Sequence, residues 1–219
     1  MNWQRIFQYV CTAFNYMPCK WFFCFGTMLT LVRDKGKFKH PDDVDVGVFL
    51  DEFEPRHLYN WCQANGFVII RKIVDDITKK PLYISIEPRE DVQRITGKFG
   101  LDVFMWMKYN GYYWHTYDVK MERPKHGVPN KYYFKGIPEH TLSEIVPINS
   151  IAGTSFHGHV PLKYGTLMDL WYPNWIEKRN ECSHTKWVMS MKSCKSIHDG
   201  SARLCEQSPD NNNIFTGRI

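Results

Sequence analysis

The chain has 219 residues, a formal charge of +5 and 43% hydrophobic residues. These proportions exclude a disordered or fibrous protein, and the charge is too small and too dispersed to indicate a nucleic-acid-binding protein. The length is enough for one sizeable core, so the sequence predicts a single domain over residues 1–206. The polar end, residues 207–219, has no periodicity and is predicted to be a disordered tail.

Membrane-spanning and export signals are both missing from the sequence. The most apolar N-terminal stretch, residues 21–32, is interrupted by Gly26 and Thr27 and is too short for a span of roughly 20 residues. It also lacks the features of a signal peptide. Seven widely spaced cysteines without a Cys-x-x-Cys pair predict reduced thiols and a cytoplasmic location, with any membrane association supplied by a partner or substrate.

Metal-capable residues gather near the C-terminus in a spacing that fits no common zinc finger. These residues are Cys182, His184, Cys194 and His198. Reduced cysteines and surface histidines are the favoured interpretation, and a zinc site is the alternative.

Hydrophobic periodicity predicts helices and strands in alternation. Residues 3–16 carry apolar residues at i, i+3 and i+4, which predicts an amphipathic helix that ends before Pro18. Apolar runs bounded by glycine or polar turns predict strands at 21–25, 44–50, 67–73, 81–86 and 101–107, with 67–73 and 81–86 in a hairpin. Further helices are predicted near Met28–Val32, from about Pro55 to Asn65, and in the region from Pro161 to Trp175. Aromatic segments at 112–117 and 132–134 are predicted to be short strands or loops whose rings pack in the core.

The segment Asp42–Gly47 places two carboxylates on one strand face. Because alternate residues of a strand point the same way, Asp43, Asp45 and Gly47 share a face while the intervening valines pack behind. Carboxylates about 7 Å apart repel each other, and a divalent cation such as Mg²⁺ or Mn²⁺ relieves that repulsion. On this pair alone, an acidic strand edge at a turn is an equally good explanation.

Two further features favour a site for metal and phosphate. Gly26 and Thr27 follow an apolar strand, where backbone N–H groups and the Thr27 hydroxyl can donate to phosphate oxygens. Asp102 is a single carboxylate in an otherwise apolar strand, which is costly unless it is paired or binds a cation. A strand followed by Gly-Thr, then Asp-x-Asp, then one aspartate on a later strand is the order of a nucleotidyltransferase-type metal site.

These motifs resemble the LicD family, which includes bacterial phosphocholine transferases and the animal proteins fukutin and fukutin-related protein. The family pattern is roughly GTLLG-x2-R, a short basic turn, and P-x-D-x-D-I-D-x-G. It is matched by Gly26-Thr27-Met28-Leu29, Arg33, Asp43-Val44-Asp45-Val46-Gly47, the later Leu101-Asp102-Val103-Phe104, and Val160-Pro161-Leu162 with Tyr164-Gly165. The resemblance spans about residues 20–175 and implies an α+β fold, with a nucleotidyltransferase-like mixed sheet flanked by helices and a C-terminal helical region.

The resemblance also implies an activity: transfer of a phospho-alcohol group, phosphocholine or a polyol phosphate, from a CDP-alcohol donor to a glycan hydroxyl. Asp43, Asp45 and Asp102 would hold Mg²⁺ or Mn²⁺, and Asp102 would also accept the proton of the acceptor hydroxyl. Substrate would be bound by Gly26, Thr27, Arg33 and Tyr164, with Arg33 forming a fork on a phosphate. No nucleic acid and no transmembrane segment are expected, and the oligomeric state is not predicted.

Two positions depart from the family pattern. Thr30 stands where the pattern has its last glycine, and Pro41 stands where an acidic residue is frequent. They keep open a catalytically silent relative that binds a glycan or assists another transferase. A second alternative keeps the fold but transfers the nucleotide itself, and the Asp-x-Asp motif does not discriminate it from the first activity. The three intact carboxylates favour an enzyme.

Overall fold

The computed structural model describes residues 2–35, 43–75, 78–116, 132–148, 157–172, 175–176, 189–193 and 203–206. Its helices are α1 (Trp3–Tyr16), α2 (Phe25–Arg33), α3 (Pro55–Ala64), α4 (Glu90–Thr96) and α5 (Tyr164–Trp171), with a 3-10 helix η1 (Glu139–Thr141). Its strands are β1 (Trp21–Phe23), β2 (Asp43–Phe49), β3 (Phe67–Val74), β4 (Pro81–Pro88), β5 (Gly100–Tyr109), β6 (Tyr112–Thr116), β7 (Tyr132–Pro138), β8 (Ile145–Ile148), β9 (Gly158–Pro161), β10 (Met189–Ser193) and β11 (Arg203–Glu206). Among these residues no helix combines the length and the apolar character needed to cross a membrane.

Within the described residues, nine strands form one mixed sheet. The order is β1-β2-β5-β6-β7-β10-β11, with β4 also beside β5 and β3 beside β4, while β8 and β9 form a separate pair. In this part of the chain β2 and β5 run parallel and every other pairing is antiparallel. Because β2 and β5 are parallel and in register, with Asp43 opposite Gly100, their first residues meet at the same end of the sheet.

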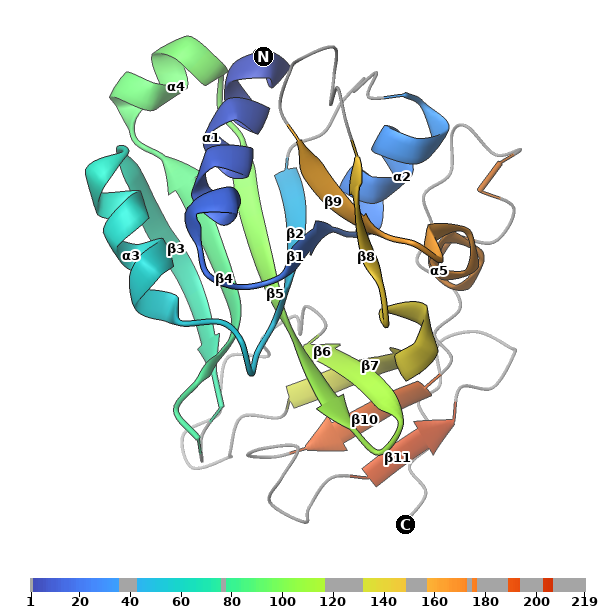
Figure 1. Cartoon of the computed structure of the whole chain (residues 1–219). Helices are drawn as coiled ribbons and strands as arrows, with labels where there is room; N and C mark the ends of the chain where they lie inside the picture. The colour runs from blue at the N-terminus through green and yellow to red at the C-terminus, as the bar shows by residue number, and fades with distance from the viewer. Residues whose placement is uncertain are drawn as a thin grey trace.

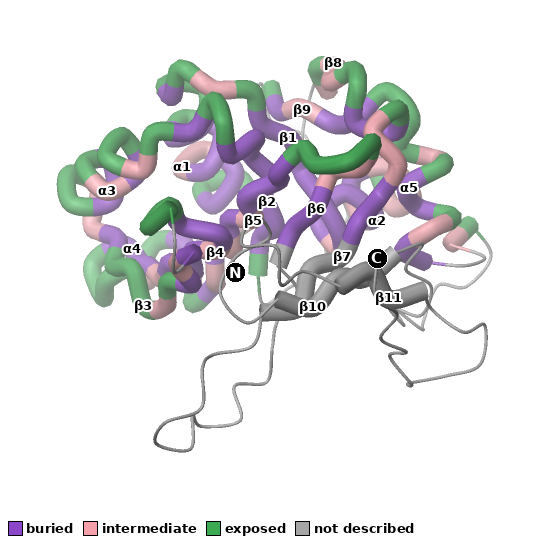
Figure 2. The backbone as a smooth tube through the Cα atoms, turned by 90° about the horizontal axis from the view of Figure 1, so that it is seen from below, coloured by how far each residue is buried: buried purple, intermediate pink, exposed green. Residues whose placement is uncertain are grey.

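Helices cover both faces of the strands β1, β2 and β5 (Figure 1). On one face α1 packs through Phe7 against Phe23, with ring centroids 5.5 Å apart. On the other face Phe25 of α2 and Trp171 of α5 pack on Trp106, at 6.2 and 6.1 Å. Figure 2 shows these central strands largely buried, with α1, α3 and α4 on one side and α2 and α5 on the other. Cover on both faces accounts for the burial of every residue of β1 and of every residue of β2 except Asp43.

The helices α1 and α3 begin and end where local groups satisfy their free backbone atoms. Asn2 precedes α1 and its side chain accepts a hydrogen bond from the Arg5 N–H at 3.2 Å. Glu54 does the same for α3, accepting from the Arg56 N–H at 3.3 Å. After α3 the chain turns through Gly66, whose φ of +75° is one that glycine adopts without steric cost. The turn returns the chain into β3 and so begins the hairpin of β3 and β4.

The structure confirms much of the predicted element order. The helix predicted over 3–16 is α1, and the helix predicted from Pro55 is α3. The strands predicted at 44–50, 67–73, 81–86 and 101–107 are β2, β3, β4 and β5, with small shifts of their ends. The predicted hairpin is the antiparallel pair of β3 and β4. The coarse fold class is confirmed as α+β, with a mixed sheet flanked by helices.

Other predictions are corrected. Helix α2 begins at Phe25 rather than near Met28, so the strand predicted over 21–25 ends at Phe23. Helix α4 is missed, although Glu90 and Asp91 in its first turn are typical of a helix start. The helix predicted between Pro161 and Trp175 is α5, although Pro161 itself ends β9. Strands β10 and β11 were not predicted, and β10 pairs with β7, because such pairing overrides weak local propensity.

Two predictions lie outside the described residues. One is the disordered tail over 207–219, and the other is the possible zinc site at Cys182, His184, Cys194 and His198.

Candidate metal centre

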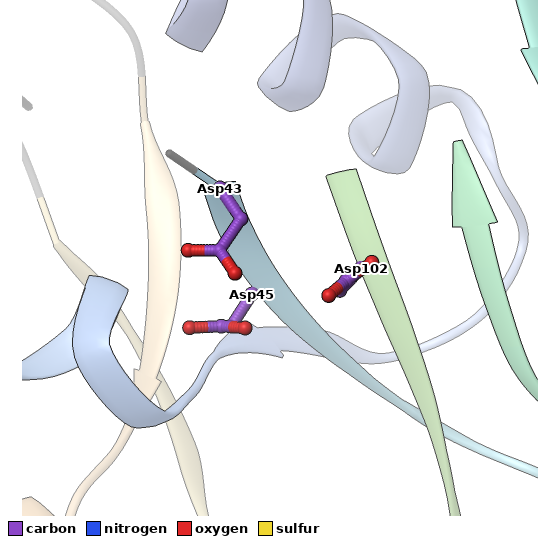
Figure 3. Close-up of side chains that lie close together, drawn as sticks. All are labelled: Asp43, Asp45 and Asp102. Atoms are coloured by element: carbon purple, nitrogen blue, oxygen red, sulfur yellow. The ribbon is translucent and has the colours of Figure 1, made fainter. Parts of the chain in front are cut away.

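Asp43, Asp45 and Asp102 come together at the end of the sheet where β2 and β5 begin. Asp45 lies directly beside Asp102 in the parallel register, and Asp43 is two residues earlier on the same face of β2. One oxygen of each carboxylate lies within 4.8 Å of the oxygens of the other two. Figure 3 shows the three side chains grouped over the two strands, beside the start of α2. The structure thus brings together the three residues that the sequence predicts as metal ligands.

The three carboxylates differ in their exposure. Asp45 is buried, with 8% of its surface exposed, whereas Asp102 is half-buried and Asp43 is exposed. Burial raises the pKa of Asp45 well above its ordinary value, and the charges of Asp43 and Asp102 raise it further. Hydrogen bonds from the backbone N–H groups of Thr27 and Gly26 act in the opposite direction. The gathering of like charge around a buried carboxylate is unfavourable unless a positive charge joins it.

This set of donors fits a hard divalent cation. Mg²⁺ and Mn²⁺ prefer oxygen ligands, and Mg²⁺ is commonly held by one or two carboxylates together with substrate phosphates. Cys24 is buried close by, but burial followed by the three aspartates raises the pKa of its thiol well above the ordinary value. The clustered ligands are three carboxylates and do not include Cys24, whereas structural zinc sites are built mostly from cysteine and histidine. The chemistry of the donors accordingly favours Mg²⁺ or Mn²⁺ over zinc.

The start of α2 is bound to Asp45 at two places. The backbone N–H groups of Gly26 and Thr27 hydrogen-bond the Asp45 carboxylate. The Thr27 hydroxyl, which is buried, accepts a hydrogen bond from the Asp45 N–H at 2.8 Å. Gly26 is also close to this carboxylate, since a Cβ at this position would lie 3.7 Å from Asp45 Oδ2. The structure therefore gives Gly26 and Thr27 a positioning contact with Asp45, while their predicted contact with substrate stays a prediction.

The backbone is strained where β1 passes into α2. Phe25 has a φ of +44°, in the left-handed region that bulky residues rarely adopt. Such a conformation costs about 1–3 kcal/mol and persists only where the surroundings enforce it. The Phe25 ring is enclosed by aromatic partners, with centroids 4.9 Å from Phe104, 5.1 Å from His115 and 4.6 Å from Trp171. This aromatic packing holds the turn that directs the first N–H groups of α2 to Asp45.

Arg33 and Tyr164, the other two predicted substrate-binding residues, lie farther along their helices or at the surface. Arg33 is the last residue of α2, two helical turns beyond Gly26 and on the same helix face. Its guanidinium forms a fork on Asp34, with Nε–Oδ1 and Nη2–Oδ2 distances of 2.9 and 2.8 Å. Tyr164 is exposed at the start of α5. The predicted contacts of Arg33 and Tyr164 with substrate stay predictions.

Tyr83 is a neighbour of the site that the sequence analysis missed. Its hydroxyl donates to Asp102 Oδ1 at 2.8 Å, and the Ser85 side chain hydrogen-bonds the same hydroxyl. Both residues lie on β4, where Ser85 is opposite Asp102. Tyr83 could be recognised as a neighbour of Asp102 only from the pairing of β4 with β5. No local sequence pattern encodes that pairing.

A cavity of about 510 Å³ lies elsewhere, near the other end of β2. Its lining includes Trp21, Phe49, Glu52 and Tyr113. Trp106 and Trp114 are each 1% exposed and belong to the core. The acidic centre and this cavity are therefore separate features of the molecule.

Comparison with protein-family models and with curated proteins provides no further information about this site. The sequence matches no protein-family model and no curated protein. The group of three aspartates and the motifs that form it are therefore the features that bear on function.

Proposed function

We propose that this chain is a Mg²⁺-dependent phosphotransferase with a nucleotidyltransferase-like fold, similar to the LicD family. It would move a phospho-alcohol group, phosphocholine or a polyol phosphate, from a CDP-alcohol donor to a glycan hydroxyl. The observation that carries the proposal is the gathering of Asp43, Asp45 and Asp102 at the one parallel strand pair of the described sheet. This gathering raises the pKa of buried Asp45 and so costs folding stability, which is expected of a site kept for chemistry.

The reaction requires one bond to form and one to break. The acceptor hydroxyl oxygen bonds to the phosphorus that carries the alcohol, and the bond from that phosphorus to the bridging oxygen breaks, so that CMP leaves. The hydroxyl proton passes to a carboxylate, for which Asp102 is the predicted acceptor. When bound, Mg²⁺ supplies positive charge to the phosphate oxygens.

The exposure and contacts of the other residues indicate their roles in the proposed reaction. Asp43 is the exposed member of the three aspartates and would be the first of them to meet a substrate from solvent. Asp45 is hydrogen-bonded to the start of α2, so its carboxylate is oriented before a ligand binds. Arg33 can reach a phosphate only by exchanging its present fork on Asp34, which makes it a candidate for closing over the donor.

The experiment that tests this function follows nucleotide release. The full chain is incubated with Mg²⁺ and, in turn, CDP-choline, CDP-ribitol and CDP-glycerol, together with a glycan acceptor, and CMP is quantified. We expect CMP from at least one donor, a loss of release in Asp45→Asn, and unchanged release in Glu52→Gln, which alters a carboxylate near the other end of β2. The absence of CMP with every donor contradicts the proposal.

The same assay separates the nearest alternative. An enzyme that transfers the nucleotide itself would release pyrophosphate from CTP and would leave CDP-alcohols intact. A silent relative would release neither product and would bind glycan equally well before and after Asp45→Asn. The repulsion centred on Asp45 favours an active centre over the silent relative, because a silent protein gains nothing from it.

A further inference from the structure

We propose that Tyr83 is a positioning residue that fixes Asp102 for cation binding. The inference rests on the proposed function, because it concerns the same centre. It assigns a role to a residue on β4, a strand that contributes no carboxylate to the group of three aspartates.

The hydrogen-bond geometry joins three residues across two strands. Ser85 lies opposite Asp102, and Tyr83 lies opposite Phe104, one step along the same face. The Tyr83 hydroxyl donates to Asp102 Oδ1 at 2.8 Å and is itself hydrogen-bonded by the buried Ser85 side chain. A phenol hydroxyl has one proton and can also accept, so it donates to Asp102 while accepting from Ser85. The proton of Tyr83 is thereby directed at the carboxylate.

Packing fixes the Tyr83 ring from both sides. The Arg71 guanidinium lies over the ring, with its Cζ 5.7 Å from the centroid. The Phe104 ring packs against Tyr83 at a centroid distance of 5.2 Å, and Phe104 in turn packs against Phe25 at the start of α2. The side chain that holds Asp102 is therefore locked into the same aromatic cluster that orients α2 toward Asp45.

A fixed hydrogen bond to a ligating carboxylate has a known consequence. It orients the carboxylate before the metal arrives, and removal of such an outer partner typically weakens metal affinity by about 10–100-fold. The bond to Oδ1 leaves acceptor capacity on both oxygens of Asp102, since a carboxylate offers about four lone-pair sites. Asp45 is oriented by α2 and Asp102 by Tyr83, so the two adjacent carboxylates have separate supports.

The hydroxyl can be separated from the ring by one substitution. Tyr83→Phe keeps the contacts with Phe104 and Arg71 and removes the hydroxyl that donates to Asp102 and accepts from Ser85. Tyr59→Phe is a matched control, because Tyr59 of α3 also has a cation over its ring: Lys72 Nζ lies 5.7 Å from the centroid. Lys72 and Arg71 are adjacent on β3, so each tyrosine contacts a cation of the same strand.

The test measures binding of Mn²⁺ by the full chain, using the electron paramagnetic resonance signal of free Mn²⁺. We expect Tyr83→Phe to bind Mn²⁺ about tenfold more weakly than the unsubstituted chain, with a metal-free Tm close to the original. Tyr59→Phe should bind Mn²⁺ with unchanged affinity. In an Asp102→Asn background the added Tyr83→Phe change should have no further effect on affinity, because the two residues act as one unit.

The possible results separate this inference from the proposed function. If Tyr83→Phe binds Mn²⁺ as well as the unsubstituted chain while Asp45→Asn loses binding, the role of Tyr83 is overturned and the metal centre stands. If the unsubstituted chain binds no Mn²⁺, both are overturned. Should Tyr83→Phe fold poorly, Ser85→Ala provides the second variant, since it removes the partner of the hydroxyl and keeps Tyr83. It should weaken Mn²⁺ binding in the same direction, and unchanged affinity in that variant overturns the inference.

Discussion

Strand β2 begins with Asp43 and Asp45, which lie beside Asp102. Just past the other end of β2, the carboxylate of Glu52 is paired with a positive charge instead of with other carboxylates. Glu52 accepts a hydrogen bond from the Lys20 N–H at 3.0 Å, and its carboxylate lies 3.5 Å from the Lys20 ammonium. Glu52 and Lys20 also line the cavity of about 510 Å³, and none of the three aspartates lines it. By the presence of a cavity alone, the functional site would lie at this end of β2, which we call the cavity end.

The difference between the two ends teaches which property indicates chemistry. At the cavity end opposite charges are paired and exposed, so their mutual attraction is weak and costs the fold little. At the acidic end two further carboxylates lie beside the buried carboxylate of Asp45, which the fold tolerates at a cost in stability. We therefore propose that the chemistry takes place at the end where like charge gathers and not at the cavity end.

The largest expected effect comes from Asp45→Asn, which breaks the acidic end. Mn²⁺ or Mg²⁺ should raise the Tm of the unsubstituted chain and should leave the Tm of the variant unchanged. In metal-free buffer the variant should be more stable by roughly 1 kcal/mol, a Tm increase of about 2–4 °C, because the repulsion with Asp43 and Asp102 is removed. Differential scanning calorimetry with and without metal measures both effects. A variant that keeps the metal-induced increase would show that Asp45 is not a ligand.

The middle of β2 provides the second prediction, because Gly47 lies between the two ends. A Cβ at Gly47 would lie 2.5 Å from Phe22 Cζ and 2.7 Å from Trp106 Nε1, so Gly47→Ala should cost about 1–3 kcal/mol in the free energy of unfolding. Gly26→Ala is the control, since its Cβ would make only an ordinary contact of 3.7 Å with Asp45 Oδ2. Urea unfolding compares the two variants. Equal stability of both would contradict the packing described here.

The third prediction uses pH, because the two ends should respond with opposite sign. Folding raises the pKa of Asp45, so the folded chain binds the extra proton, and this contribution to stability is lost as the pH rises through the folded pKa. At the cavity end burial lowers the pKa of His159, so its contribution is present above the unfolded pKa and is lost as the pH falls.

Urea unfolding in metal-free buffer between pH 5 and pH 8 tests these two opposite dependences of stability on pH. Asp45→Asn should remove the component of stability that declines with pH, and His159→Gln should remove the component that increases with pH. Profiles of the variants that superimpose on the profile of the unsubstituted chain would refute the assignment of these two groups.

The smallest expected effect is that of Glu52→Gln at the cavity end. The ion pair is exposed, with 71% of the Lys20 side chain and 40% of the Glu52 side chain accessible, so its loss should change stability by less than about 0.5 kcal/mol. Binding of Mn²⁺ should not change, because Glu52 lies beyond the opposite end of β2 from the aspartates. A loss of Mn²⁺ affinity in this variant would remove the distinction between the two ends.

The sequence was informative where a local pattern has a single physical meaning. The alternation in Asp43–Phe49 requires a strand with its valines on one face, and Val44, Val46 and Val48 are all fully buried. The same alternation places Asp43 and Asp45 on one side, and the lone charge at Asp102 indicates a partner for them. The group of three aspartates was thus predictable as a set of residues.

Local patterns were uninformative where the position of a side chain or strand depends on contacts with distant segments of the chain. The Thr27 hydroxyl accepts a hydrogen bond from the Asp45 N–H, a contact between two elements that no local pattern indicates. Strand β10 has little strand signal and exists by pairing with the edge of β7.

By itself, the sequence determined which residues carry charge, which segments have helix or strand periodicity, and that Asp43, Asp45 and Asp102 need a partner for their charge. Only the tertiary structure decided that β2 and β5 run parallel and in register, and this makes Asp45 and Asp102 neighbours. It also placed Tyr83 against Asp102 and the start of α2 against Asp45. The physical reason is that periodicity fixes the face on which a side chain lies, whereas register depends on contacts between segments far apart in the chain.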